Sequence, residues 1–216
     1  VMAAYPYATW TDITQTSPFC LFTDLRKTPD YSPVRFNPQN FPSIYAEMGC
    51  GIQMGYDRRP IVYPQGVATV LLRSLGSGSN GIGYYMYHGG TGYYSEGEGF
   101  LPRISYDFQA PLAENGQERE SYRRLRVLHH FINAFGPTLA PMQTVLPKDN
   151  DLITADDHDR LRYAARMKDG NGFLFLINYQ DHDTLRHDIK GIRFQLKLRQ
   201  ENLQIPYSGS LTLPKN

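Results

Sequence analysis

The stretch Tyr45-Ala46-Glu47-Met48-Gly49-Cys50-Gly51 decides the interpretation of this chain, because a carboxylate there follows an apolar run and precedes several glycines. Residues 43–46 are aromatic and β-branched enough to predict a short buried strand. The glycines predict a turn in which backbone approaches a ligand closely. Glu47 would then sit at the carboxyl end of a strand, where α/β barrels carry their chemistry. The alternative is that Glu47 caps the next helix or pairs with Arg58 or Arg59.

A second strand is predicted for residues 82–87, which are apolar and aromatic almost throughout. Between the two strands, residues 64–75 place aliphatic side chains on one helical face, which predicts a helix. A strand, a helix and a strand within about 45 residues form a βαβ unit with parallel strands. We therefore expect Glu47 and Tyr85 at the same end of one sheet.

The pattern of apolar residues changes along the chain. Residues 1–41 are predicted to be mostly loop. The strong helical periodicity of the apolar residues in 118–135 predicts a helix there. After Gly136-Pro137 the apolar positions alternate, and Asp169-Gly170-Asn171-Gly172 predicts a hairpin turn. A further alternating segment is predicted for residues 189–198. We therefore expect two domains, residues 1–140 and residues 141–216, the second of them rich in β-structure.

Composition narrows the classes of partner. The 216 residues carry a net charge of +1 and 20% charged residues, which gives no electrostatic footprint for nucleic acid or an anionic membrane surface. The sequence contains no apolar run long enough to predict a membrane span. Aromatic residues make up 13%, with 16 tyrosines, which fits a cleft that stacks on sugar-like ligands or, equally, a tyrosine-rich sheet.

The sequence predicts neither a metal site nor a cofactor. Cys20 and Cys50 are too far apart for a Cys-x-x-Cys site, and they form either one disulfide or two buried thiols. His129 and His130 are adjacent on the predicted helix, so they cannot face one metal together. His88-Gly89-Gly90 is similar to an oxyanion loop, but no Gly-x-Ser-x-Gly motif accompanies it, which argues against a serine hydrolase.

Three stretches together resemble the β-galactosidases of glycoside hydrolase family 35. They are Ala46-Glu47 with Gly51, Tyr84-Tyr85-Met86-Tyr87-His88-Gly89-Gly90-Thr91, and Ser105-Tyr106-Asp107-Phe108-Gln109-Ala110-Pro111-Leu112. Their order and spacing agree with the family over roughly residues 40–140. The resemblance implies a retaining exo-glycosidase on a (β/α)8 TIM barrel, in which Glu47 is the nucleophile that follows strand seven.

The same resemblance implies the residues that bind the substrate. Tyr85 is expected to point at the terminal galactose, and Phe108 takes the place of a tyrosine that usually touches the sugar. Tyr45 is expected to contact substrate as well. Phe108 departs from the family pattern, as do Ile52 and Gly92, so the sequence leaves the exact sugar open.

A second carboxyl group is needed, because retaining hydrolysis uses two of them about 5–5.5 Å apart. The family's acid/base glutamate lies before the nucleophile strand, yet residues 1–41 contain no glutamate. A whole barrel takes about 250 residues. We therefore expect an internal fragment, the C-terminal portion of the barrel followed by a segment of an all-β, sandwich-like domain, and we expect it to be inactive alone.

Two other functions stay open from the sequence. The first is a non-catalytic carbohydrate-binding relative of the same fold, and the second is a structural β-rich interaction protein in which the glycine turns are accidental. The partner implied by the resemblance is a carbohydrate substrate. Glycan-degrading enzymes of this kind are often exported, so a secreted or periplasmic location is expected by analogy.

Overall fold

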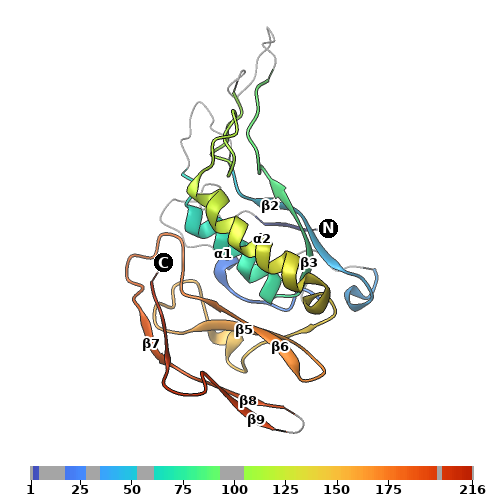
Figure 1. The fold of residues 1–216 in the computed structure, drawn as a ribbon, viewed down its shortest axis with the longest axis vertical. Helices are drawn as coiled ribbons and strands as arrows, with labels where there is room; N and C mark the ends of the chain where they lie inside the picture. The colour runs from blue at the N-terminus through green and yellow to red at the C-terminus, as the bar shows by residue number, and fades with distance from the viewer. Residues whose placement is uncertain are drawn as a thin grey trace.

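The computed structural model describes residues 2–4, 18–27, 35–52, 61–92, 105–198 and 201–215. Within these ranges the chain forms a small parallel sheet, two long helices, and a group of antiparallel strands (Figure 1). Three short 3-10 helices, η2 (Pro18–Cys20), η3 (Pro38–Asn40) and η4 (Asn150–Leu152), lie in the connections. No helix in the described part of the chain is long and apolar enough to span a membrane.

The parallel sheet confirms the predicted βαβ unit. β2 (Ser43–Gly49) pairs in parallel with β3 (Ser79–Tyr85), and Gly49 lies opposite Tyr85. β3 begins and ends a few residues earlier than the sequence predicted. The sheet also has a third strand, β1 (Met2–Ala4), which pairs in parallel with β2 inside a region that was predicted to be loop. The described residues thus form an open sheet of three strands and no closed barrel.

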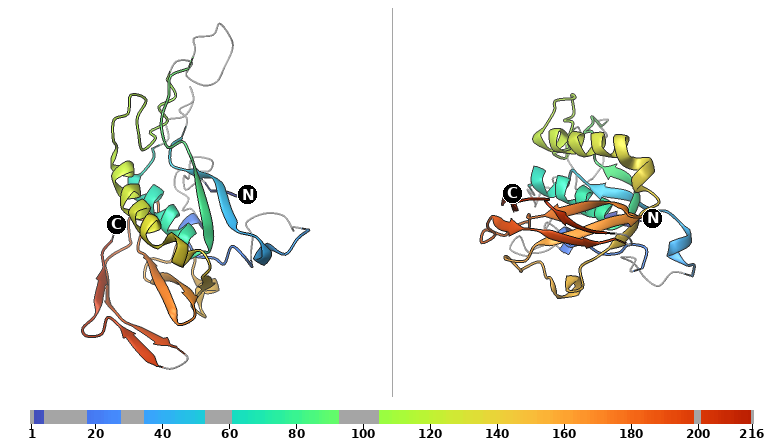
Figure 2. Two further views of the ribbon diagram at one scale, coloured as in Figure 1. Left: turned by 45° about the vertical axis from the view of Figure 1, so that its right-hand side comes forward. Right: turned by 60° about the horizontal axis from the view of Figure 1, so that its bottom comes forward.

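Two helices cover one face of this sheet (Figure 2). α1 (Pro64–Gly76) matches its prediction and begins with a proline, which is suited to the first helical position because that residue needs no amide donor. Its apolar face is fully buried, as Val67, Val70 and Leu71 show. The other face of the sheet is open among the described residues, and Ile44 on β2 is 43% exposed.

α2 (Glu120–Leu139) is longer than predicted, and the expected end at Phe135 is wrong. The helix continues through Gly136-Pro137, although proline removes one helical hydrogen bond. Two features favour the extra turn. Leu139 is only 3% exposed, and the Ala140 amide donates to the Gly136 carbonyl at 2.8 Å. Burial of Leu139 therefore offsets the missing bond, since a buried leucine contributes about 1.5–3 kcal/mol.

The chain after α2 consists of antiparallel strands. β4 (Gln143–Val145), β5 (Arg162–Lys168) and β6 (Asn171–Ile177) form one sheet in that order. The predicted hairpin turn is confirmed, with Asp169 and Gly170 at φ +51° and +82° between β5 and β6. The predicted segment 189–198 is split, because β7 (Ile189–Ile192) pairs with β10 (Leu211–Leu213) while β8 (Phe194–Lys197) pairs with β9 (Asn202–Ile205).

One hydrophobic core joins the helices to the β5–β6 hairpin, since α1 packs against both the parallel sheet and this hairpin. The buried residues Val67, Leu71, Leu125, Phe175 and Ile177 all belong to it. The change of pattern that the sequence showed thus falls where α2 ends. The division into residues 1–140 and 141–216 as separate domains stays a prediction.

Arg166 on β5 lies between the two helices and the β5–β6 hairpin and has no exposed surface. Its guanidinium donates to the Leu75 carbonyl at 2.7 Å, to the Leu139 carbonyl at 3.0 Å and to the Met142 carbonyl at 2.8 Å. The first two carbonyls belong to the last turns of α1 and α2, which lack helical partners. Burial lowers the pKa of Arg166 to about 10. One cation therefore caps both helices from the strand beneath them.

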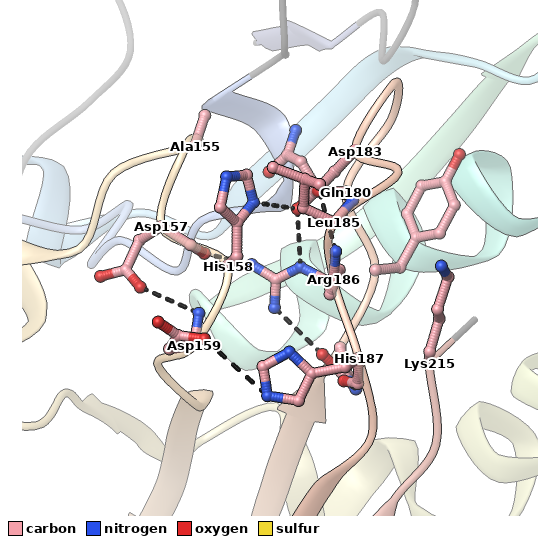
Figure 3. A network of polar contacts seen from close by, with 12 residues as sticks. Ala155, Asp157, His158, Asp159, Gln180, Asp183, Leu185, Arg186, His187 and Lys215 are labelled. Atoms are coloured by element: carbon pink, nitrogen blue, oxygen red, sulfur yellow. Dashed lines mark hydrogen bonds and ion pairs between the residues drawn. The ribbon is translucent and has the colours of Figure 1, made fainter.

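A second buried arginine, Arg186, fixes the connection between β6 and β7 (Figure 3). It donates to Asn178 Oδ1 at 3.0 Å, to the Asp157 carbonyl at 2.5 Å and to Asp183 Oδ2 at 3.3 Å. His158 Nδ1 lies 2.9 Å from the same Asp183 oxygen. Burial alone would raise the pKa of Asp183, but hydrogen bonds from His158 and from backbone amides more than offset it, so that pKa is lowered.

Candidate active site

The candidate site is built where β2 and β3 end. Hydrogen bonds join these ends to each other and to the segment 105–113. The Cys50 amide donates to the Tyr85 carbonyl at 3.2 Å, and the Ile52 amide donates to the Phe108 carbonyl at 2.7 Å. Gly51 lies so close to this segment that a Cβ there would be 2.8 Å from the Phe108 oxygen. The glycine turn after Glu47 is thus needed for packing between protein segments.

The turn after β3 packs against the same segment. The Gly89 amide donates to the Leu112 carbonyl at 2.8 Å, and the Tyr106 amide donates to the Gly90 carbonyl at 2.9 Å. A Cβ on Gly89 would lie 2.9 Å from the Cα of Asp107. Since the Gly89 amide already has an acceptor inside the protein, this turn does not present it to an oxyanion.

Glu47 and Tyr85 lie at the same end of the parallel sheet. Glu47 is half-buried and stands two residues before Gly49, which is paired with Tyr85. Tyr85 is the last residue of β3 and is 40% exposed, so its ring is accessible. Arg58 and Arg59, which the sequence offered as partners of Glu47, lie outside the described residues.

Phe108 is half-buried and has φ +55°, which is unusual for a bulky residue. Its ring packs edge-to-face on Tyr106, with centroids 6.1 Å apart. Because the Phe108 carbonyl binds Ile52, the segment that carries the ring is tied to the turn after β2. The three residues Glu47, Tyr85 and Phe108 therefore come from connected segments at one end of the sheet.

Tyr45 on β2, which was also expected to contact substrate, is buried in the core. It has no exposed surface, and its hydroxyl accepts a hydrogen bond from Arg73 Nη1 at 2.7 Å. Arg73, on α1 and 3% exposed, also donates to the Leu21 carbonyl at 2.7 Å and to Thr23 Oγ1 at 2.9 Å. In this structure the Tyr45 ring offers no surface to a sugar, and it joins β2 to the helix behind it.

Asp107 organises the segment beside Phe108. Its carboxylate pairs with Arg119 Nη2 at 2.6 Å and accepts the Glu114 amide at 2.9 Å. Burial alone would raise the pKa of Asp107, but the bonds from the Glu114 amide and from Arg119 more than offset it, so that pKa is lowered. Arg119 also donates to the Ala110 carbonyl at 2.7 Å. Sequence reasoning missed Arg119, because it placed this residue in the first turn of the predicted helix 118–135, whereas the observed helix begins at Glu120.

Glu114 connects the two sides of the turn that begins after β3. One of its oxygens accepts a hydrogen bond from Thr91 at 2.5 Å and the other accepts one from Ser105. These two bonds lower the pKa of Glu114, which keeps the carboxylate ionised at neutral pH. Thr91 and Ser105 also form an isolated antiparallel bridge, so both backbone and side-chain hydrogen bonds hold these two residues together.

The histidine on the buried side of α2 is used in packing. His129 Nε2 lies 2.6 Å from the hydroxyl of Tyr84, the β3 residue next to Tyr85. Burial and the neighbouring His130 lower the pKa of His129, which favours a neutral ring that accepts from Tyr84. Among the described residues, no group of three or more histidine, cysteine or acidic side chains is placed to hold a metal ion.

Comparison with known proteins identifies the class. The family model for glycosyl hydrolases family 35 matches residues 7–132, which is more than half of the chain, so the chain belongs to this family. It is also 35% identical over 98 residues to "Beta-galactosidase 8" of Arabidopsis thaliana. That match covers 44% of this chain and 12% of the Arabidopsis protein, so the chain corresponds to a small part of its relative. Family membership implies a TIM-barrel fold, whereas the described residues show an open parallel sheet and no closed barrel.

Proposed function

We propose that this chain supplies the nucleophile side of the active site of a retaining β-galactosidase. The observation that carries the proposal is the position of Glu47 at the carboxyl end of a parallel strand, beside the exposed Tyr85, in a chain of this family. In TIM-barrel enzymes this end of the sheet is where catalytic residues gather.

The chemistry requires one carboxylate on each side of the scissile bond. Glu47 attacks the anomeric carbon of a terminal β-galactoside and forms a galactosyl ester, while the bond to the leaving oxygen breaks. A second carboxylic acid protonates that oxygen, and its conjugate base later removes a proton from the water that hydrolyses the ester. We infer that this second group comes from a part of the enzyme outside this chain, since residues 1–41 contain no glutamate.

The surrounding residues receive different roles. Tyr85 is exposed at the strand end and is proposed to face the galactose. Phe108, held by the turn after β2, is proposed to form a second wall of the sugar pocket. For Tyr45 we propose support in place of sugar contact, because its hydroxyl is bound to Arg73 in the core. The exact glycan and linkage are open.

The decisive test is to trap the ester in the parent enzyme. In a 2-fluoro-galactoside the fluorine destabilises positive charge at the anomeric carbon, which slows both the formation and the hydrolysis of the ester. A good leaving group restores the rate of formation only. The ester should accumulate, and mass spectrometry should place the sugar on the peptide that contains residues 45–51. Glu47→Gln should abolish labelling and turnover, because an amide of similar shape is a far weaker nucleophile.

A matched control is Glu118→Gln, which changes an exposed carboxylate near the start of α2. This variant should keep labelling and turnover near the wild-type values. A label on another carboxylate, or near-normal turnover in Glu47→Gln, would contradict the assignment of Glu47. Galactoside binding without any turnover in the parent protein would favour the non-catalytic, carbohydrate-binding relative.

A further inference from the structure

A second concave site lies at the opposite end of the parallel sheet, where its strands begin. The 3-10 helix η3 leads into β2. Residues of η3, of the segment 24–27 and of β4 together line a pocket of about 290 Å³. Its lining includes the amides of Gln39, Asn40 and Gln143, together with Asp24, Arg26 and Thr144. Glu47 lies four positions after Ser43, where β2 begins, so at about 3.3 Å per residue the pocket is more than about 13 Å from Glu47 along the strand. One sugar residue therefore cannot occupy both sites.

The lining offers both donors and acceptors of hydrogen bonds. An amide side chain donates and accepts, a threonine hydroxyl does the same, and a carboxylate accepts. All of the described lining residues are polar. A ligand that fits such a lining must itself carry several groups that donate and accept, as the hydroxyls of a sugar do.

The charges in the pocket argue against a metal ion. Asp24 brings a carboxylate into the lining, and Lys27 is paired with it at 3.2 Å. Arg26 already donates to the Gln39 carbonyl, which uses part of its guanidinium. A metal ion would need more than the single carboxylate that the lining provides. Once Lys27 is paired with Asp24, Arg26 remains as one surplus positive charge, and its Nε has no hydrogen-bond partner among the described residues. This donor can bind a hydroxyl oxygen of a neutral sugar, and the competition with phosphate described below separates a neutral ligand from an anion.

We propose that this pocket binds one neutral sugar residue, at a site separate from the candidate active site. Its volume is close to the lower end of the range for small-ligand pockets, about 300 Å³, which suits a single monosaccharide. Phe41, which is 54% exposed and packs edge-to-face on Phe36, follows Asn40 directly and provides an apolar ring next to η3. Because one monosaccharide forms few hydrogen bonds in such a pocket, we expect dissociation constants of about 1–10 mM.

The test is a titration of the ¹⁵N-labelled chain with methyl β-galactopyranoside, followed by amide chemical shifts. Shifts are expected for residues 24–27, 39–40 and 143–144. The double variant Asn40→Ala/Gln143→Ala should weaken this binding at least about tenfold, because it removes two amides from the lining. Both side chains are at least partly exposed, so the fold should be kept. Asn133→Ala, which removes an exposed amide from α2, is the matched control and should leave binding unchanged.

The outcome is separable from that of the proposed function. Glu47→Gln should not change the shifts at this pocket, because Glu47 lies at the other end of β2. Shifts that vanish in Glu47→Gln and persist in the double variant would mean that sugar binds only at the candidate active site, and would overturn the proposal. The absence of shifts up to about 100 mM sugar, or displacement of the sugar by inorganic phosphate at lower concentration, would overturn it as well.

Discussion

Replacing Arg166 by methionine should destabilise the chain strongly, because this buried side chain binds carbonyls of two helix ends. The variant keeps a long side chain in the core but removes the arginine's hydrogen bonds to the carbonyls of Leu75, Leu139 and Met142. The Leu75 and Leu139 carbonyls keep a backbone donor each, the amides of Gly78 and Met142. Each lost hydrogen bond from a charged donor is worth about 1.5–3 kcal/mol, and removal of a buried charge offsets part of the sum. We therefore expect a loss of about 3–5 kcal/mol in the free energy of unfolding.

Urea denaturation followed by circular dichroism would measure this loss. For a chain of this size each kcal/mol corresponds to about 2–4 °C, so the melting temperature should fall by about 6–20 °C. Arg166→Lys should recover only part of the stability, because an ammonium cannot reach several carbonyls with the geometry of the guanidinium fork. The matched control is Arg124→Met on α2, which loses an exposed pair with Glu120 and should cost less than about 0.5 kcal/mol. A change below about 1 kcal/mol in Arg166→Met would refute the capping argument.

Three further outcomes are expected. The pKa of Asp183 is lowered in the folded chain, so its carboxylate contributes fully to stability above the ordinary pKa of about 3.9. This contribution is lost as the pH falls through the lowered pKa of the folded chain. Asp183→Asn should therefore flatten this part of the pH dependence of unfolding. Gly51→Ala should cost about 1–3 kcal/mol, because its Cβ would meet the Phe108 carbonyl, and an unchanged melting curve would contradict this. Burial raises the pKa of Cys20 to about 12 and also raises that of Cys50, so neither free thiol should react with iodoacetamide at pH 8 until urea unfolds the chain, as mass spectrometry can show.

Local pattern was sufficient for the elements in which burial and propensity agree. The parallel pair β2 and β3, the helix α1 and the turn at Asp169-Gly170 followed from apolar spacing and turn residues alone. α2 ran past its predicted end because burial of Leu139 outweighs the proline rule, and no local pattern reports that burial. β1 was missed because a strand of three residues is too short to show alternation.

The buried arginines that support the site and the core were not predicted from the sequence. Arg73, Arg166 and Arg186 resemble ordinary surface charges in the sequence, yet all three are nearly or fully buried. Each of them donates to at least one backbone carbonyl that is distant in sequence, so no local motif reveals its role. The position of Glu47 at a strand end followed from the residues, whereas its proposed role needed the family resemblance, because a carboxylate at a strand end can also be a cap.

The bond between Tyr45 and Arg73 has a mechanical consequence for the strand that carries Glu47. A strand can fail by sliding along its neighbours in steps of one residue, about 3.3 Å, and each such step turns every side chain to the other face. Tyr45 stands two residues before Glu47, and its hydroxyl is fastened to α1, so β2 cannot slip without breaking a contact to a different layer of the protein. A group that attacks a carbon atom must be held to within about 0.5 Å. The tyrosine acts as a stop that fixes the axial position of the strand and, with it, the reach of the carboxylate.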